Sequence, residues 1–255
     1  MKTHYHLDKE VGYELPIGEQ LLPLNQFLGQ KLRIEFLGKI FCKNCGRKTS
    51  KSFSQGYCFP CFRSLAQCDS CIVKPELCHF DAGTCREPEW GVRNCKIAHT
   101  VYLANSSGLK VGVTRTHQQT TRWIDQGAIA AIPIATVKRR KDAGLIEIEL
   151  KKTLNDKTNW RAMLKGETTD IDLAEERRKV LDLLPDNVEF KRVSDEFTAI
   201  HYPILQHPTK VTSFNLDKNP IIEATLQGIK GQYLIFDTGV VNIRKYAGYE
   251  IQFTA

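Results

Sequence analysis

Residues 42–61 read CKNCGRKTSKSFSQGYCFPC, and this stretch does most to decide the fold. Cys42 and Cys45 form one C-x-x-C pair, and Cys58 and Cys61 form a second pair farther along. Each pair presents two thiolates to one ion, and two pairs complete a zinc tetrahedron with no open position for a substrate. We therefore predict a structural Zn²⁺ ion at these four cysteines, with iron–sulfur chemistry as the alternative.

The remaining cysteines extend this metal-binding region toward residue 99. All nine cysteines fall between residues 42 and 95, which in a reducing compartment indicates metal ligands rather than disulfides. We predict that the last five hold a second zinc ion. The set expected for it is Cys71, Cys78, Cys85 and Cys95. The spacing leaves other choices open, and these further candidates are Cys68, His79 and His99.

Composition narrows the class of protein. Of the 255 residues, 42% are hydrophobic and 25% are charged, which are ordinary globular values. No apolar run approaches the roughly 18 residues that span a bilayer, and the N-terminus lacks the apolar core of a signal peptide. We therefore expect a cytoplasmic protein with no membrane association. The net charge of +7 favours a polyanionic partner, DNA or RNA, without choosing between them, and the oligomeric state is left open.

Hydrophobic periodicity predicts an α+β fold. Alternating residues 31–37 predict a strand, and 100–104 with 109–113 predict a hairpin around a turn. Helices are expected at 116–127, from the capping residue Asp142 to about 154, and at 171–184. Short strands after residue 187 predict a small C-terminal barrel or sandwich. The expected domains are a lead-in and strand (1–40) that could complete that barrel, the cysteine module (41–99), a central core (100–184) and a C-terminal β domain (185–255).

The central core collects residues suited to phosphodiester cleavage. They are Tyr102, Lys110, Arg115, Arg122 and Glu147. One carboxylate can hold a divalent metal, cations neutralise phosphate charge, and a tyrosine or a metal-bound water can transfer the proton. Sugar chemistry would require paired carboxylates instead. Each residue also has an ordinary structural explanation, such as a packed aromatic for Tyr102, a solvated cation for Lys110 or an ion pair for Arg122.

The order of these residues resembles the GIY-YIG nuclease superfamily. Its first strand carries G-[IV]-Y and its second Y-[IV]-G, followed by a helical arginine and a helix reading A-x-x-L-E-x-x-L-I-K. Here 100–102 read TVY, 110–112 read KVG, Arg122 follows, and 143–152 read AGLIEIELKK with Glu147 in register. Asn159 falls near the superfamily's late asparagine. The resemblance covers residues 100–160 and implies a small sheet with flanking helices.

The resemblance also implies roles. Glu147 would ligate Mg²⁺ or Mn²⁺, Tyr102 would act as general base or position the water, and Arg122 would stabilise the transition state. Two departures stand out. Lys110 replaces the tyrosine of the second motif, and the segment before Arg122 is longer than in the superfamily, which keeps Arg115 as an alternative phosphate contact. The whole chain is also similar to an uncharacterised bacterial family with the same motif order, which brings no activity with it.

Two basic segments are candidate nucleic-acid surfaces. The connector 138–141 reads KRRK, and the C-terminal strands combine cations with aromatics that could track phosphates and stack bases. The candidates are Lys138, Arg139, Arg140, Lys230, Tyr233, Arg244 and Lys245. A purely structural barrel is the alternative. Three hypotheses follow: a metal-dependent nuclease, a non-catalytic DNA- or RNA-binding protein with a degenerate nuclease core, and a protein-interaction scaffold.

Overall fold

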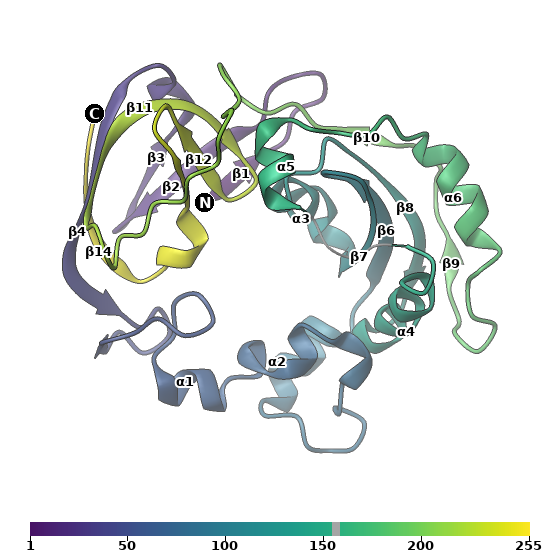
Figure 1. Ribbon diagram of the computed structural model, residues 1–255. Coiled ribbons are helices and arrows are strands. Elements are labelled where there is room, and N and C mark those ends of the chain that lie inside the picture. Colours follow the sequence, from purple (N-terminus) through teal and green to yellow (C-terminus); the bar gives the residue numbers. More distant parts are fainter. Residues whose placement is uncertain (155–158) are drawn as a thin grey trace. The chain divides into compact units, whose positions relative to one another are not determined.

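The computed structural model describes residues 1–154 and 159–255 and divides the chain into two compact units (Figure 1). Unit 1 comprises Met1–Arg63, Trp160–Glu167 and Ile200–Ala255, and unit 2 comprises Ser64–Asn159 and Thr168–Ala199. The cysteine-rich segment is therefore shared between the units, with the division after residue 63. Among the described residues, no helix is both long and apolar enough to cross a membrane.

Unit 1 is built on an antiparallel sheet that curves as a half-barrel (Figure 1). Its strand order is β13-β12-β11-β4-β14, and β5 pairs with β4. The strands are β4 (Lys31–Phe41), β5 (Lys48–Thr49), β11 (Ile221–Lys230), β12 (Tyr233–Phe236), β13 (Val240–Asn242) and β14 (Tyr249–Thr254). Because β4 lies between β11 and β14, the strand predicted at 31–37 belongs to the same sheet as the C-terminal strands.

Unit 1 also contains elements that the sequence did not predict. The first 30 residues include a three-stranded antiparallel sheet of β1 (Lys2–His4), β2 (Gly12–Ile17) and β3 (Gln20–Pro23). Helix α5 (Trp160–Lys165) buries Met163 and Leu164 against Ile235 and Val240 of the curved sheet. Helix α1 (Phe59–Ser64) contains Cys61, the last residue of the second cysteine pair.

Unit 2 is organised around a second antiparallel sheet, with the order β10-β8-β6-β7 and β9 paired to β8. Its strands are β6 (His99–Asn105), β7 (Leu109–Arg115), β8 (Ala130–Val137), β9 (Lys191–Arg192) and β10 (Thr198–Ala199). The predicted hairpin is present as β6 and β7, with Tyr102 opposite Gly112. Strands β7 and β8 pair with both edges of β6, and every residue of β6 is buried. The strand expected at 188–193 is reduced to β9.

Helices complete unit 2. They are α2 (Pro88–Cys95), α3 (Gln119–Asp125), α4 (Arg140–Leu150) and α6 (Leu173–Leu181). Ile146 and Leu150 of α4 and Val180 of α6 join one buried cluster with the sheet. Asp142 was expected to cap α4, but the N-cap is Arg139, and Asp142 lies in the first turn. Short 3-10 turns lie at Asn25–Phe27, Ala66–Cys68, Ser70–Ile72, Pro75–Leu77, Thr116–Gln118 and Ile243–Tyr246.

Candidate functional site

The four cysteines of unit 1 form a compact group in which all four Sγ atoms lie within 4.8 Å of one another. Cys42 follows β4 directly, and the amide of Gly46 donates to the Cys42 carbonyl at 2.8 Å, which closes the first turn. The Sγ atoms of Cys45 and Cys58 are 3.7 Å apart. A tetrahedral zinc ion with Zn–S bonds of about 2.3 Å separates its sulfurs by about 3.8 Å. The four thiols are therefore positioned to hold a zinc ion.

The electrostatics of this group also suit a cation. Burial alone would raise the pKa of the Cys42 thiol, but backbone amides of Cys45, Cys58 and Asn44 donate to its sulfur and lower it to about 6. The side-chain amide of Asn44 donates to Cys61 Sγ at 3.4 Å. These donors favour the thiolate, the form in which cysteine binds zinc, while burial and hydrogen bonds with the other three thiols raise the pKa of Cys61 to about 12.

The cysteines of unit 2 are arranged differently. The group whose ligand atoms all lie within 4.8 Å consists of Asp69, Cys71 and His79. Among the described residues, the predicted set of Cys71, Cys78, Cys85 and Cys95 does not meet that limit. Cys78 and Cys95 line one small cavity with Phe80 and Lys96, and a side chain at Gly91 would meet Phe80 and Cys85 Sγ. Cys68 ends a 3-10 turn, and His99 lies buried in β6.

Asp69 already has strong partners. Its carboxylate accepts from Arg86 Nε at 2.8 Å and lies 3.3 Å from His79 Nε2. Burial would raise the pKa of Asp69, but the Arg86 charge together with hydrogen bonds from Ser70 and His79 lowers it. Asp69, Arg86 and His79 thus form an ion-pair network. Of the four cysteines predicted to bind a second zinc ion, only Cys71 lies in the group with Asp69 and His79.

Tyr102 is completely buried at the centre of the unit 2 sheet. Its hydroxyl donates to Gln126 Oε1 at 3.0 Å, and its ring packs edge-on against Trp123 of α3. A Cβ added at Gly112 would lie 2.6 Å from the Tyr102 hydroxyl, so only glycine fits opposite the ring. Sequence reasoning missed Gln126, because no motif connects it to Tyr102.

Arg122 and Glu147 both act electrostatically on Tyr102. Burial raises the pKa of Tyr102 to about 12, the charge of Arg122 and a hydrogen bond from it oppose the rise, and the charge of Glu147 adds to it. The Glu147 side chain is 13% exposed, and Lys151 Nζ lies 3.3 Å from its carboxylate. Burial raises the pKa of Glu147, against the opposing charge of Lys151. Tyr102 therefore lies within electrostatic reach of the other two predicted residues, and Lys151 pairs with Glu147.

The other predicted catalytic residues have structural contacts. Arg115 donates from Nε to the Asn94 carbonyl at 3.2 Å and lies over the Trp90 ring. Lys110 is 5% exposed rather than solvated. The Asn159 amide donates to Ser107 Oγ at 2.9 Å, and its side chain is not placed against Glu147 by any described contact.

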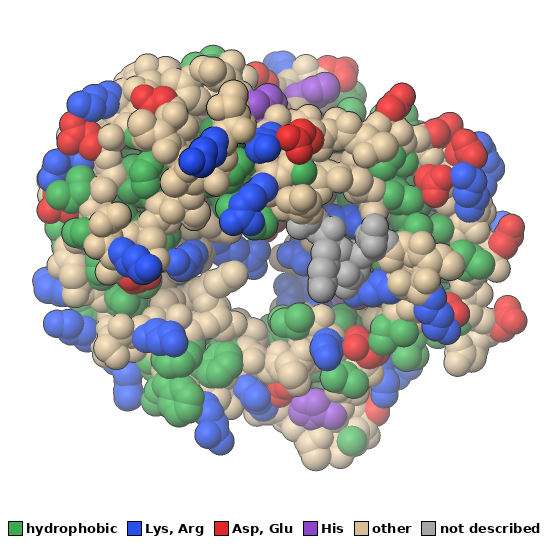
Figure 2. All heavy atoms as spheres, in the orientation of Figure 1, with side chains coloured by type: hydrophobic (Ala, Val, Ile, Leu, Met, Phe, Trp, Pro, Cys, Tyr) green, Lys and Arg blue, Asp and Glu red, His purple; other side chains and the backbone are tan. Residues whose placement is uncertain are grey.

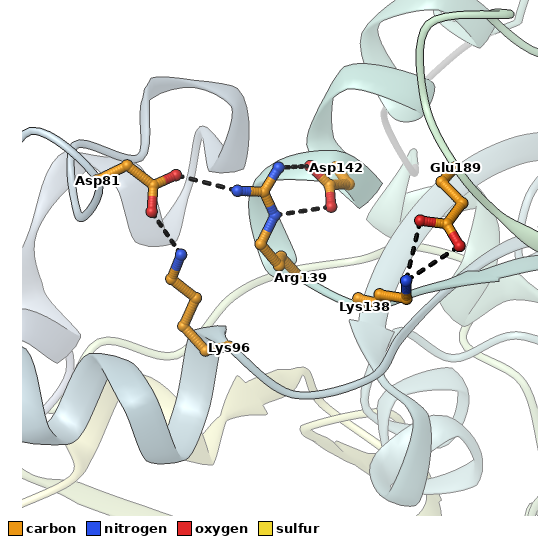
Figure 3. Close-up of polar contacts among 6 residues, drawn as sticks. All are labelled: Asp81, Lys96, Lys138, Arg139, Asp142 and Glu189. Atoms are coloured by element: carbon orange, nitrogen blue, oxygen red, sulfur yellow. Dashed lines mark hydrogen bonds and ion pairs between the residues drawn. The ribbon is translucent and has the colours of Figure 1, made fainter.

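Two of the four cations in the connector 138–141 are paired with carboxylates (Figure 3). Lys138 Nζ lies 3.0 and 2.9 Å from the two carboxylate oxygens of Glu189. Arg139 binds both oxygens of Asp142, at 2.9 and 2.6 Å, and also reaches Asp81 at 3.0 Å. Asp81 in turn pairs with Lys96. The sequence predicts a basic patch at the KRRK run, but two of its cations form ion pairs with carboxylates that are distant in the sequence.

Arg140 points inward instead of toward solvent. It donates to the Ile72 carbonyl at 2.5 Å, and its Nε atom is buried with no partner among the described residues. Burial lowers the pKa of its guanidinium, and the nearby Cys95 and Arg115 have opposite effects on it. Buried His99 donates from Nδ1 to the Ile97 carbonyl, which leaves Nε2 unpartnered in the described part of the chain. Burial lowers the pKa of His99 to about 4, so its ring is neutral.

The C-terminal candidates lie in unit 1 and differ in exposure. Lys230 is 2% exposed, and burial lowers its pKa to about 8. Its Nζ lies 5.4 Å from the ring centroid of Tyr202. Tyr233 stacks on Trp160 with an interplanar angle of 3°. Arg244 and Lys245 are exposed on the 3-10 turn after β13.

Comparison with known families gives one match. The model of the family described as "Protein of unknown function (DUF2797)" matches residues 29–251, so the chain belongs to that family. The comparisons with curated proteins and with solved structures found no match.

Proposed function

We propose that this member of the DUF2797 family acts on nucleic acids, and that unit 2 hydrolyses a phosphodiester at Tyr102, Arg122 and Glu147. The observation that carries the proposal is that the buried Tyr102 hydroxyl lies within electrostatic reach of both Arg122 and Glu147. One residue from each of two helices, far apart in sequence, thus acts on the same strand residue, which is the kind of grouping that a catalytic site needs. The element order β6-β7-α3-β8-α4 adds support, because it carries the motifs in the order of the GIY-YIG superfamily.

The residues suggest a division of roles. Glu147 would hold Mg²⁺ or Mn²⁺, since magnesium is bound by one or two carboxylates together with substrate phosphates and waters. That ion would supply charge neutralisation at the phosphate. Arg122 is exposed, so its guanidinium can reach a phosphate and stabilise the negative charge that develops there.

The role of Tyr102 follows from its environment. With its pKa raised to about 12, the phenol stays protonated near neutral pH, so it serves as a hydrogen-bonding group rather than as a general base. Gln126 Oε1 accepts a hydrogen bond from the phenol and fixes its orientation. Because the hydroxyl is buried and donates its hydrogen bond to Gln126, Tyr102 would act indirectly, by accepting a hydrogen bond from Arg122 and holding that guanidinium in place.

A second candidate is nucleic-acid binding without catalysis. Two observations favour it. Lys110 stands where the superfamily carries a catalytic tyrosine, and Lys151 pairs with the Glu147 carboxylate that would have to bind metal. Either candidate requires affinity for nucleic acid that falls as salt rises, because released counterions drive phosphate contacts. A protein-interaction scaffold would show no such affinity.

A cleavage assay with two matched variants tests the proposal. The full chain is incubated with end-labelled RNA and DNA, as single strands, duplexes and hairpins, with Mg²⁺ or Mn²⁺. We expect Glu147→Gln to lower the cleavage rate by about 100-fold or more, because it removes the charge that holds the metal. Glu149→Gln is the control, since Glu149 lies on the same helix and pairs with Lys152 at the surface.

The outcomes separate the candidates. Cleavage that Glu147→Gln leaves unchanged would contradict the proposed active site. Salt-sensitive binding without cleavage by the wild-type chain would support the non-catalytic candidate. Absence of salt-sensitive binding to every probe would contradict both and favour the scaffold.

A further inference from the structure

The zinc-binding segment of unit 1 carries an unusual separation of charge. Residues 36–63 contain six lysines and arginines and no aspartate or glutamate. Lys39 pairs with Glu250 at 3.2 Å, which uses one of these cations. Four of them are exposed and form no ion pair with any described residue. They are Arg47, Lys48, Lys51 and Arg63. This excess positive charge is therefore available to an anionic partner.

Aromatic rings lie among these cations. The Phe53 ring is 5.4 Å from that of Phe59 and 5.7 Å from that of Phe62, and the second pair is stacked with an interplanar angle of 25°. Phe59 opens α1 and is 50% exposed, so part of its flat ring faces solvent. A half-exposed aromatic ring in a cluster keeps a stacking surface that a core residue would have covered.

The cations and rings are interleaved rather than separate. Lys51 Nζ lies 5.4 Å from the Phe53 centroid, and Arg63 Cζ lies 5.9 Å from the Phe59 centroid. Lys43 Nζ lies 4.9 Å from the centroid of buried Tyr57. Figure 2 shows hydrophobic side chains bordered by Lys and Arg over α1, at the lower left of the view. We call this surface the ribbon face and define it by Lys48, Lys51, Phe53, Phe59 and Arg63.

The backbone and the predicted zinc ion would hold the ribbon face rigid. Phe53 and Tyr57 pair across a turn in which Ser54 and Gln55 adopt positive φ angles of 43° and 63°. Phe59 directly follows the metal-binding Cys58, so its position depends on the cysteine group. A preformed surface loses less conformational entropy on binding than a flexible one.

We propose that the ribbon face binds single-stranded nucleic acid, with an unpaired base stacked on Phe59 and phosphates held by the surrounding cations. An aromatic ring interleaved with cations is the combination by which proteins bind single strands without reading their sequence. A duplex would satisfy the cations but would keep its bases stacked away from Phe59. This surface lies in unit 1, so the inference goes beyond the proposed cleavage site and does not depend on it.

Fluorescence anisotropy of the zinc-loaded full chain tests the inference. The probes are mixed-sequence fluorescein-labelled oligonucleotides, as single-stranded DNA, single-stranded RNA and the corresponding duplex. We expect tighter binding to either single strand than to the duplex. The slope of log K against log salt should be about −0.7 for each phosphate contacted. The two single strands show which sugar is preferred.

Three variants assign the effect to the ring. Phe59→Ala should weaken single-strand binding by about 5- to 100-fold, because one stacked base is lost. Phe59→Tyr should retain the affinity, because the flat ring is kept. Phe197→Ala is the matched control, since Phe197 is 63% exposed in unit 2 and follows Asp195 and Glu196. Equal zinc content and equal thermal unfolding of all variants show that each is folded.

Failure of this inference can be told apart from failure of the proposed function. Wild-type affinity in folded Phe59→Ala, or stronger binding to the duplex than to single strands, would overturn the ribbon face as a single-strand site. Cleavage lost in Glu147→Gln is a separate result and leaves single-strand affinity unchanged if the ribbon face binds the strand. Binding to acidic peptides with no affinity for oligonucleotides would also contradict the inference.

Discussion

The ribbon face of unit 1 and the connector 138–141 of unit 2 are similarly basic in sequence, yet their surroundings differ. In the connector, Lys138 pairs with Glu189 and Arg139 with Asp142 and Asp81, as Figure 3 shows. Around the ribbon face, no carboxylate occurs for 28 consecutive residues, 36–63. A run of cations therefore stays available to an anionic partner only where the fold brings no acid to it.

The cysteines of the two units also differ, because those of unit 1 form a compact group and those of unit 2 do not. Removing a cysteine from the compact group gives the largest effect that we expect. Cys45→Ser removes one ligand from the compact group of unit 1, and we expect loss of one zinc equivalent and of the local structure of 42–61. The reason is that structural zinc contributes about 10–16 kcal/mol of apparent binding free energy in zinc-finger peptides. Mass-spectrometric metal content and limited proteolysis measure the loss.

Cys85→Ser, in the dispersed group of unit 2, is the matched change. It should leave the zinc ion of unit 1 in place and keep 42–61 resistant to protease. Equal zinc loss in both variants would show that the two groups are not independent and would break the contrast.

Each unit also contains a buried cation, Arg140 in unit 2 and Lys230 in unit 1. The two differ because a lysine can lose its proton when it is buried, whereas an arginine cannot. Burial lowers the pKa of Lys230 to about 8, below the ordinary lysine value of about 10.4. Between these values the unfolded chain binds the proton and the folded chain does not, so stability rises with pH. Below pH 8 Lys230 is charged in the folded protein as well, and its buried charge lowers the free energy of unfolding by up to about 3 kcal/mol.

Urea unfolding at a series of pH values measures how Lys230 changes the free energy of unfolding. Lys230→Met should stabilise the protein at pH 7 and should lack the part of the rise between pH 8 and 10 that wild type shows. Lys245→Met, at an exposed lysine, should follow wild type throughout. Parallel wild-type and Lys230→Met curves would mean that Lys230 titrates normally and is not held in an apolar environment.

The sequence predicted the features that depend on short spacings. Two C-x-x-C pairs place four thiols through local turns, and alternation over 100–113 predicts the β6–β7 hairpin, so neither needs distant information. The first three strands were missed because their alternation is broken by exposed positions and prolines. Tyr102, Arg122 and Glu147 could be grouped only through the resemblance to a known superfamily, since no local pattern links a strand to two helices.

What sequence reasoning could not supply was the long-range pairing of charges. Glu189 lies 51 residues from Lys138, and Asp81 lies 58 residues from Arg139. Nothing in the KRRK run shows that these acids would reach it. The ribbon face was missed for the opposite reason, because its charge is spread between cysteines and is noticeable only once the absence of acids is counted.

A charge-reversal pair tests the opening comparison directly and gives the smallest expected effect. Lys48→Glu with Lys51→Glu should weaken single-strand binding about tenfold and reduce the salt slope by about 1.4, because two phosphate contacts are lost. Lys138→Glu with Arg139→Glu changes the net charge by the same amount. It should alter affinity far less, because those cations are already paired with carboxylates of the same chain. The variant should still fold, since exposed ion pairs contribute only about 0–1 kcal/mol to stability. A larger loss in the connector variant would show that nucleic acid displaces Glu189 and Asp142, and that unit 2 supplies the principal binding surface.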